Sequence, residues 1–264
     1  MTWSPQQYLA FEDERTRPVR DLLAAVPDGY RGRVIDLGCG PGNSTEVLSA
    51  KLPAARVSGI DSSADMIQAA RKRLPSLEFS VASIAADGAG NIAAWQDPGP
   101  FDVILANAVL QWLPDHAALF PALLAKLAPG GALAVQMPDN LDEPSHRLMR
   151  EIAMDGPWAA KLAGAAAART TLNDAAWYFD VMRPVAVRVD LWRTTYYHEL
   201  AGGAGAVVEW FKGSGLRPFL QALDAGEQVV YLDRYTEAIS RVFPARLSGS
   251  VLLPFPRLLM VAIR

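Results

Sequence analysis

The sequence predicts an α/β fold in which a mostly parallel sheet carries helices on both faces. Short apolar segments rich in β-branched residues alternate with helical segments between residues 31 and 137, a pattern typical of parallel sheets. A turn with three glycines, Gly38-Cys39-Gly40-Pro41-Gly42, directly follows the first of these apolar segments. Because glycine lacks a Cβ atom, the backbone of such a turn can approach a ligand closely. Strand, turn and following helix therefore predict a ligand-binding corner at the carboxyl ends of the strands.

The composition argues against several classes of function. The chain has 264 residues, of which 51% are hydrophobic and 20% charged, as expected for a globular protein with a sizeable core. A net charge of −3 and the lack of a lysine- and arginine-rich run argue against nucleic-acid binding. No apolar stretch reaches membrane-spanning length, and the N-terminus lacks a signal-peptide pattern. With one cysteine, Cys39, and three histidines at no metal-ligand spacing, we expect a cytoplasmic protein without a disulfide or a metal.

Residues 1–30 precede the first strand and are expected to form an N-terminal helical lid. Residues 6–26 predict one helix or two, interrupted at Pro18, because proline cannot donate the backbone hydrogen bond of a helix interior. Arg15 and Arg17 lie on this stretch beside a run of acidic residues. Taken alone, this charge pattern favours a solvated helix face.

Residues 31–139 are expected to form the ligand-binding α/β core. The expected strands are Arg33–Leu37, Arg56–Ile60, Leu77–Val81, Phe101–Ala106 and Ala132–Met137, with helices at Ser44–Leu52, Ser62–Leu74 and 115–127 between them. Residues 84–100 read as a glycine-bearing loop. Because parallel strands end at the same edge of a sheet, the polar side chains at their carboxyl ends share that edge. These side chains are Asp36, Asp61, Ser83, Asn107 and Gln136.

After Asp139 the alternation stops. Residues 140–264 are expected to complete the sheet, within a single domain, and to insert a helical cap that binds the substrate. Strands are expected at Val187–Tyr197 and Leu258–Ile263, and helices at Pro144–Asp155, Val207–Phe211, Pro218–Leu223 and Glu227–Val242, with an irregular or helical stretch at Gly164–Arg169. The extra helices need a surface to cover, and the ligand edge of the sheet is the natural candidate.

The glycine spacing indicates which kind of cofactor the corner binds. A dinucleotide-binding turn reads G-x-G-x-x-G and places a pyrophosphate at a helix N-terminus. Here the spacing is G-x-G-x-G, and Asp36, two residues ahead of it, would repel a pyrophosphate but suits a cofactor with ammonium and sulfonium groups. Asp61 ends the second expected strand about 20 residues beyond the last glycine, where a carboxylate can bind ribose hydroxyls. The alternative is a plain strand–helix–strand unit with a glycine turn.

Several longer blocks carry more information than the turn. They are Trp3 with Tyr8–Phe11 and Arg15–Pro18, Leu37–Thr45, Asn107-Ala108 with Leu110–His116, Gln136–Asn140, Asp190–His198, Gly215–Pro218 and Phe255–Leu258. On these blocks the chain resembles the trans-aconitate 2-methyltransferases, a family of class I S-adenosylmethionine-dependent methyltransferases. The glycine motif marks only the superfamily, whereas Gln111–His116 and Trp192–His198 are far more specific.

The resemblance implies a Rossmann-like sheet of seven strands, the last antiparallel, with S-adenosyl-L-methionine as cofactor and one carboxylate of trans-aconitate as methyl acceptor. At one position the chain departs from the family, which usually has an acid where Ser83 stands; a serine binds the adenine amine more weakly than a carboxylate. Asp87 is the alternative partner for adenine if the following loop folds back. Together with the sheet edge, the resemblance implies the cofactor-binding residues Tyr8, Arg15, Asp36, Gly38, Cys39, Gly40, Asn43, Asp61, Ser62, Met66, Ser83, Ile84, Asn107 and Trp112.

Methyl transfer to a carboxylate needs no general base, because carboxylic acids are ionised at pH 7, and we therefore expect no catalytic residue. Alignment of the acceptor and its desolvation beside the positive sulfur should drive the reaction. The charges of the acceptor favour arginine, whose planar fork pairs with carboxylates. The expected substrate-binding residues are Arg17, Gln136, Tyr197, His198 and Arg217, whereas Arg257 is expected to be structural.

Other interpretations stay open at this point. The chain could methylate another small carboxylic acid, or bind a cofactor without turnover. It could also be a nicotinamide-dependent oxidoreductase, although the glycine spacing and Asp36 count against that hypothesis. Trp112 either walls the cofactor or anchors the helix that follows it. We expect a monomer or weak oligomer that binds a small-molecule polycarboxylate and no nucleic acid or membrane.

Overall fold

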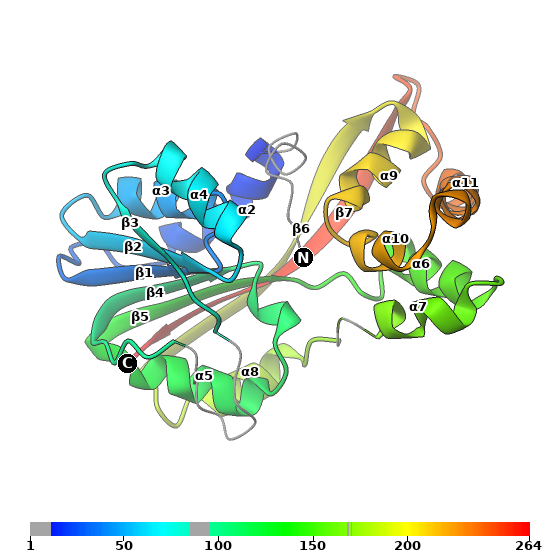
Figure 1. The fold of residues 1–264 in the computed structure, drawn as a ribbon. Helices are drawn as coiled ribbons and strands as arrows, with labels where there is room; N and C mark the ends of the chain where they lie inside the picture. Colours follow the sequence, from blue (N-terminus) through cyan, green and yellow to red (C-terminus); the bar gives the residue numbers. More distant parts are fainter. Residues whose placement is uncertain (1–11, 85–94, 168, 170) are drawn as a thin grey trace. The chain divides into compact units, whose positions relative to one another are not determined.

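The computed structural model describes residues 12–84, 95–167, 169 and 171–264, with the backbone alone for residues 12–15 (Figure 1). The chain forms two compact units. The first unit comprises Met1–Pro138, Leu172–Thr194 and Leu258–Arg264, and the second unit comprises Asp139–Thr171 and Thr195–Arg257. The chain therefore leaves the first unit twice and returns to it twice. The expected division into lid, core and cap stays a prediction.

One sheet of seven strands has the order β3-β2-β1-β4-β5-β7-β6 and confirms the predicted fold class. The first five strands are parallel, and Asp36 lies opposite Gly59 on one side and Leu105 on the other. Residues 130 and 139 are hydrogen-bonded to residues 264 and 256, so β7 runs antiparallel to β5. The strands are β1 (Arg33–Leu37), β2 (Arg56–Asp61), β3 (Glu78–Val81), β4 (Phe101–Asn107), β5 (Leu127–Pro138), β6 (Arg188–Ala201) and β7 (Ser250–Ile263).

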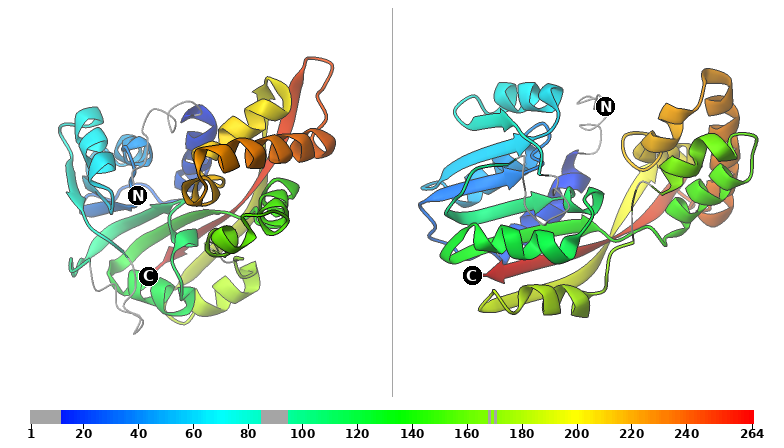
Figure 2. Two further views of the ribbon diagram at one scale, coloured as in Figure 1. Left: turned by 45° about the vertical axis from the view of Figure 1, so that its right-hand side comes forward. Right: turned by 60° about the horizontal axis from the view of Figure 1, so that its bottom comes forward.

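Helices cover both faces of the sheet in the first unit (Figures 1 and 2). Alternation along β4 shows why both faces are buried: Val103 and Leu105 pack on one side, and Ile104 and Ala106 on the other. The first of these faces carries α2 (Glu12–Ala24), α3 (Asn43–Lys51) and α4 (Ala64–Arg73), and the second carries α5 (His116–Ala125) and α8 (Ala175–Met182).

The prediction that Pro18 interrupts the N-terminal helix is wrong. Helix α2 runs through Pro18 from Glu12 to Ala24. Its second half buries Val19, Leu22 and Leu23 against apolar residues of α3 and the sheet. Burial of three such side chains contributes several kcal/mol, which offsets the roughly 3 kcal/mol that an interior proline costs.

Three other elements differ from the sequence prediction for identifiable reasons. Strand β7 begins at Ser250 rather than Leu258, because Pro254 and Pro256 interrupt the apolar pattern although the strand continues through them. Strand β5 likewise begins before its glycine pair rather than after it. Helix α8 was not expected; its N-cap, Asp174, accepts a 2.8 Å hydrogen bond from the backbone N–H of Trp177.

In the second unit, helices pack beside the remaining parts of β6 and β7 (Figure 2). The longest, α11, is tied to α6 by hydrogen bonds from the Tyr231 hydroxyl to the Met149 carbonyl and from the Tyr235 hydroxyl to the Ser145 carbonyl. Within the described residues, no helix is both long and apolar enough to cross a membrane. The helices are α6 (Pro144–Met154), α7 (Ala159–Ala166), α9 (Gly203–Lys212), α10 (Arg217–Ala222) and α11 (Ala225–Val242).

Candidate active site

The glycine turn after β1 forms one wall of the candidate site. The backbone φ angles of Gly38, Gly40 and Gly42 are 65°, 54° and 94°. Residues with a side chain rarely adopt such positive φ angles. A Cβ atom on Gly38 would lie 2.4 Å from Cγ2 of Val109, so the turn packs closely against the segment after β4. A Cβ atom on Gly40 would meet no described atom within 4 Å. The backbone of Gly40 therefore faces open space at the strand ends.

Asp61 fastens this turn to the end of β2. Its Oδ2 atom accepts a 3.0 Å hydrogen bond from the Gly40 backbone N–H, and its Oδ1 atom accepts one of 2.9 Å from the Ser63 N–H. The backbone N–H of Cys39 donates to the Ile60 carbonyl at 3.0 Å and strengthens the same junction. A carboxylate offers about four lone-pair positions, so these two bonds leave acceptor capacity on Asp61.

Asp36 lies beneath the turn and is fully buried, with an exposed fraction of 0%. Its Oδ2 atom accepts 2.7 Å hydrogen bonds from the hydroxyls of Ser44 and Thr45, which hold the start of α3 against β1. Within the described part of the chain, the buried Oδ1 atom has no hydrogen-bond partner. Burial raises the pKa of Asp36 to about 7, opposed by the two hydroxyls and reinforced by the negative charge of Asp61.

The end of β4 contributes a second, strained wall. Ala108 has a φ of 53°, which is unusual for a residue with a side chain. Hydrogen bonds hold it there: its N–H donates to the Gln136 carbonyl at 2.8 Å, and its carbonyl accepts from Gln111 Nε2 at 2.7 Å. The Gln136 amide in turn donates to Asn107 Oδ1 at 2.6 Å. Gln111 Oε1 is buried and, among the described residues, without a partner.

A buried pair fixes the short 3₁₀ helix η1 (Leu110–Trp112) that follows Ala108. His116 Nε2 lies 2.9 Å from the Leu110 carbonyl, and His116 Nδ1 lies 2.7 Å from the Tyr178 hydroxyl. Because a carbonyl can only accept, Nε2 carries the proton and Nδ1 accepts from the Tyr178 hydroxyl. The sequence did not predict this hydrogen-bonded pair, because His116 and Tyr178 lie 62 residues apart.

The other predicted cofactor residues differ in their burial. Met66 and Ile84 are almost fully buried, Asn43 is buried in the first turn of α3, Ser83 and Trp112 are half-buried, and Ser62 is exposed. Cys39 is buried, and burial raises the pKa of its thiol far above the ordinary range, which argues against a role as a nucleophile. Tyr8, Asp87 and the side chain of Arg15 lie outside the described residues.

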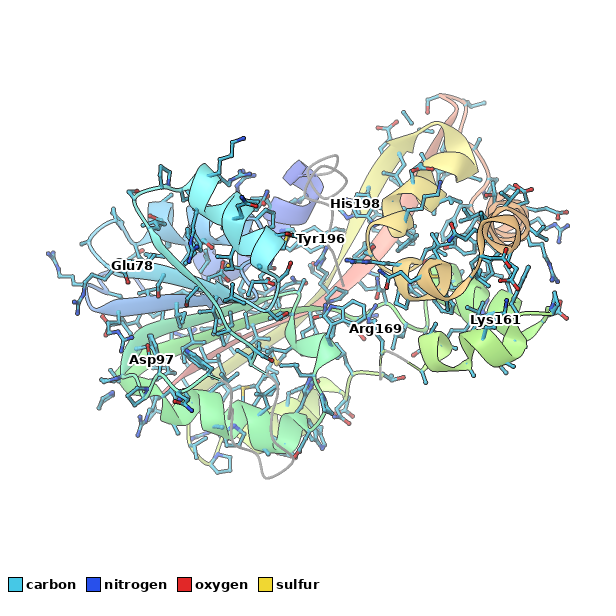
Figure 3. All side chains as sticks on the ribbon, in the orientation of Figure 1. Glu78, Asp97, Lys161, Arg169, Tyr196 and His198 are labelled. Carbon is cyan, nitrogen blue, oxygen red and sulfur yellow. The ribbon has the colours of Figure 1, made fainter. Side chains whose placement is uncertain are left out.

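The predicted acceptor residues belong to both units: Arg17 and Gln136 lie in the first, and Tyr197, His198 and Arg217 lie in the second. Tyr197 and His198 are neighbours on β6, and their side chains point to opposite faces of the strand. The Tyr197 side chain is 62% exposed, whereas that of His198 (Figure 3) is 5% exposed. The His198 ring stacks on the Trp210 ring, with 4.6 Å between the ring centres. Arg17 is exposed and Arg217 half-buried, with a pKa lowered by burial.

A basic cluster in the second unit was missed by sequence reasoning. We use this name for Arg150 on α6, Arg169 on the segment after α7 (Figure 3), and His146 on α6. Burial, followed by the positive charges of Arg169 and Arg150, lowers the pKa of His146 well below its ordinary value. Burial and the charge of Arg150 lower the pKa of Arg169 to about 10, while Asp139 acts in the opposite direction. The alanine-rich run before Arg169 has no periodicity that would have marked this arginine as buried.

Arg257 was expected to precede the last strand as a structural residue, but it lies within β7. It is 5% exposed, and its guanidinium stacks 4.7 Å from the centre of the Phe255 ring. The long hydrocarbon stem and the stacked fork make arginine, rather than lysine, suited to such a position.

Comparison with known sequences identifies relatives over the full length of the chain. A family model described as a methyltransferase domain matches residues 10–181. A trans-aconitate 2-methyltransferase of Azoarcus sp. (strain BH72) is 54% identical over 263 residues, which span 100% of this chain and 99% of the relative. A protein of the same name from Rhizobium meliloti (strain 1021) is 52% identical over 264 residues, with 100% and 99% covered.

Solved structures of low sequence identity share the fold. The YcgJ protein from Bacillus subtilis aligns over 94% of this chain and 98% of its own, with a TM-score of 0.57 and 11% identity. Phosphoethanolamine N-methyltransferase 2 of Haemonchus contortus, in complex with S-adenosyl-L-methionine, aligns over 95% of this chain and 52% of its own. Its TM-score is 0.52 and its identity 13%, so this likeness speaks for the fold alone.

Proposed function

This chain belongs to the trans-aconitate 2-methyltransferases, a family of S-adenosylmethionine-dependent methyltransferases. From this membership we propose that it forms the monomethyl ester of trans-aconitate or of a similar small polycarboxylate. The observation that carries the proposal is the identity of 54% and 52% to relatives of that name over nearly their whole length. The cofactor is S-adenosyl-L-methionine.

We propose that the corner formed by Gly38, Gly40 and Asp61 holds the cofactor. The open space beside Gly40, which a Cβ atom would enter, suits a ligand that approaches the backbone. Asp61 keeps acceptor capacity for ribose hydroxyls beyond its two backbone bonds. When bound, the cofactor supplies a methyl group on a positively charged sulfur. The other residues proposed to contact it are Tyr8, Arg15, Asp36, Cys39, Asn43, Ser62, Met66, Ser83, Ile84, Asn107 and Trp112.

The chain's own contribution to the reaction is binding and alignment. The acceptor carboxylate is ionised at pH 7, so no side chain has to remove a proton. His146, the histidine of the basic cluster, stays neutral at this pH because burial and two arginines lower its pKa. Guanidinium groups can hold the carboxylates that do not react, and exclusion of water makes the reacting carboxylate a better nucleophile.

The nicotinamide-dependent alternative is disfavoured. Gly38, Gly40 and Gly42 repeat at every second position, whereas a dinucleotide turn needs a wider gap before its last glycine. Asp36 beneath the turn would also repel a pyrophosphate when ionised. The relatives of highest identity named above are methyltransferases.

A panel of acceptors tests the proposed function. The purified chain receives S-adenosyl-L-methionine labelled in the methyl group together with trans-aconitate, a saturated dicarboxylate or a monocarboxylate. We expect label in a trans-aconitate monomethyl ester, identified by mass spectrometry, with much lower kcat/KM for the monocarboxylate. Equal turnover of all three acids, or none, would contradict the proposal. The cytoplasmic location and the monomeric or weakly oligomeric state stay predictions.

A further inference from the structure

We infer that the basic cluster of the second unit, Arg150 and Arg169 with His146, binds the carboxylates of the acceptor that are not methylated and so selects polycarboxylates over monocarboxylates. The inference rests on the proposed function, because it assigns residues to the acceptor of that reaction. It names a set of residues that differs from the one expected from the sequence.

The two arginines of the cluster bond to the short segment Asp139–Leu141, which directly continues β5. Arg150 Nη2 donates to the Leu141 carbonyl at 2.8 Å, and Arg169 Nη1 donates to Asn140 Oδ1 at 3.2 Å. In sheets of this kind, ligands bind just beyond the carboxyl ends of the strands, and this segment begins there for β5. Both guanidinium groups are therefore anchored on the part of the second unit that is closest in sequence to the strand end.

Two other parts of the second unit that carry arginines contact the segment or the cluster through neighbouring residues. The backbone N–H of Asp139 donates to the Pro256 carbonyl at 3.0 Å, which places the neighbouring Arg257 beside it. A Cβ atom on Gly215 would lie 3.1 Å from His146 Nε2, so the turn leading to Arg217 packs against the cluster. The two guanidinium groups with printed bonds to the segment are those of Arg150 and Arg169, and the residues next to Arg257 and Arg217 pack close by.

The charge balance of this region favours an anionic ligand. Burial, and then the positive charge of Arg150, make the cationic form of Arg169 less favourable, as the lowered pKa of Arg169 records. Asp139 is the carboxylate that acts on Arg169 in the opposite direction. Some other acids of the unit form ion pairs elsewhere, as Glu151 does with Arg147 at 3.3 Å and Glu209 with Lys212 at 2.5 Å. An incoming polycarboxylate would compensate the crowded positive charges.

The reaction itself demands such compensation. Trans-aconitate carries three carboxylates, one of which becomes a neutral ester while two stay charged. Charged groups leave water only where opposite charges replace their hydration. The chain has a net charge of −3, so its overall field does not attract a trianion, and the compensation has to be local.

Arg150→Gln and Arg169→Gln test the assignment, with Arg147→Gln as the matched control. Arg147 lies on the same helix as Arg150, and its side chain is about half exposed beside Glu151. We expect each cluster variant to raise KM for trans-aconitate at least tenfold, because losing one partner of a desolvated charge pair is costly. The control should keep the wild-type KM. The Kd of the cofactor, measured by calorimetry, should stay within twofold in all three variants.

Two further measurements separate ligand binding from a structural role. Arg150→Lys and Arg169→Lys keep the charge and should recover part of the lost affinity for trans-aconitate, and turnover of a monocarboxylate should be unchanged in every variant. In the wild type, hydrogen exchange in residues 139–150 should slow on adding trans-aconitate, a result that does not depend on how the variants fold. Wild-type KM in both glutamine variants, or unchanged exchange, would overturn the inference. If the wild type methylates no polycarboxylate, the proposed function fails as well.

Discussion

The backbone N–H of Gly40 donates a 3.0 Å hydrogen bond to Oδ2 of Asp61, which joins the turn after β1 to the end of β2. Asp61 therefore has two roles. Its carboxylate holds Gly40 at a φ of 54°, where the backbone faces open space, and its remaining lone pairs can accept hydrogen bonds from a ligand in that space. Loss of the Asp61 carboxylate would therefore change the backbone conformation of the turn and remove a hydrogen-bond acceptor from the proposed cofactor site.

Asp61→Ala should therefore weaken binding of S-adenosyl-L-methionine at least tenfold. A hydrogen bond to a charged group contributes about 1.5–3 kcal/mol, and about 1.4 kcal/mol corresponds to a tenfold change in Kd. Calorimetry on the folded variant measures the effect. Asp65→Ala is the control, because Asp65 is an exposed acid in the first turn of α4 and should leave Kd unchanged. Wild-type affinity in Asp61→Ala would remove Asp61 from the cofactor site.

The sequence predicts the sheet and the cofactor corner well because their signals are local. The turn from Gly38 to Gly42 and the acid at Asp61 are set by short patterns with a direct physical meaning, namely positive φ values and a carboxylate at a strand end. The first four strands are short segments with apolar, mostly β-branched or aromatic residues, and their positions were predicted to within a residue or two.

The remaining features depend on partners far away in the sequence. His116 and Tyr178 meet across 62 residues, and α8, which carries Tyr178, was not expected at all. Arg169 is buried by the packing of the second unit, and no local pattern distinguishes it from a surface arginine. Tyr197 and His198 follow the simple alternation of a strand, which would have separated them had the extent of β6 been predicted.

The stability of the chain should depend on pH through Asp36. Its pKa is raised to about 7 in the folded state, mainly by burial, whereas an aspartate in an unfolded chain titrates near 3.9. The folded state therefore binds this proton more tightly, and the contribution of Asp36 to stability is full below about pH 4 and is lost as the pH rises to about 7. Above pH 7 the contribution should level off.

Urea unfolding of the wild type and of Asp36→Asn at pH 5 to 8 measures this contribution. Asparagine keeps an acceptor for Ser44 and Thr45 but does not titrate. The difference in the free energy of unfolding, wild type minus variant, should fall by about 1.4 kcal/mol per pH unit between pH 5 and 7. Parallel pH profiles for the two proteins would show that Asp36 is already ionised in the folded state.

Gly40→Ala should separate the fold from cofactor binding. The left-handed backbone costs an alanine about 1–2 kcal/mol, but no described atom lies within 4 Å of the added methyl group, so the variant should fold. Gly29→Ala is the matched control, since Gly29 has a φ of 92° and equally open surroundings but lies before β1. We expect similar losses of stability in both variants and a loss of cofactor affinity of at least tenfold in Gly40→Ala alone. If both variants bind the cofactor normally, the turn does not line the site.

The His116–Tyr178 hydrogen bond should be strongly coupled, because both residues are buried. Tyr178→Phe leaves His116 Nδ1 without its donor, and an unsatisfied buried polar atom costs about 1–3 kcal/mol. His116→Phe removes the bond to the Leu110 carbonyl as well, which loosens the segment that carries Gln111 and Trp112. A double-mutant cycle of unfolding free energies should therefore give a coupling of about 0.5–3 kcal/mol.

The same cycle, repeated for cofactor affinity, shows whether the pair also acts on the candidate site. His116→Phe should weaken cofactor binding more than Tyr178→Phe does, because His116, unlike Tyr178, contacts the carbonyl of Leu110 at the start of η1. His146→Phe serves as a comparison, since His146 is an equally buried histidine of the second unit, away from η1 in the sequence. Additive losses of stability in the His116–Tyr178 cycle would show that the 2.7 Å contact contributes nothing. Coupling in stability without any change in cofactor Kd would restrict the pair to the packing of α5 against α8.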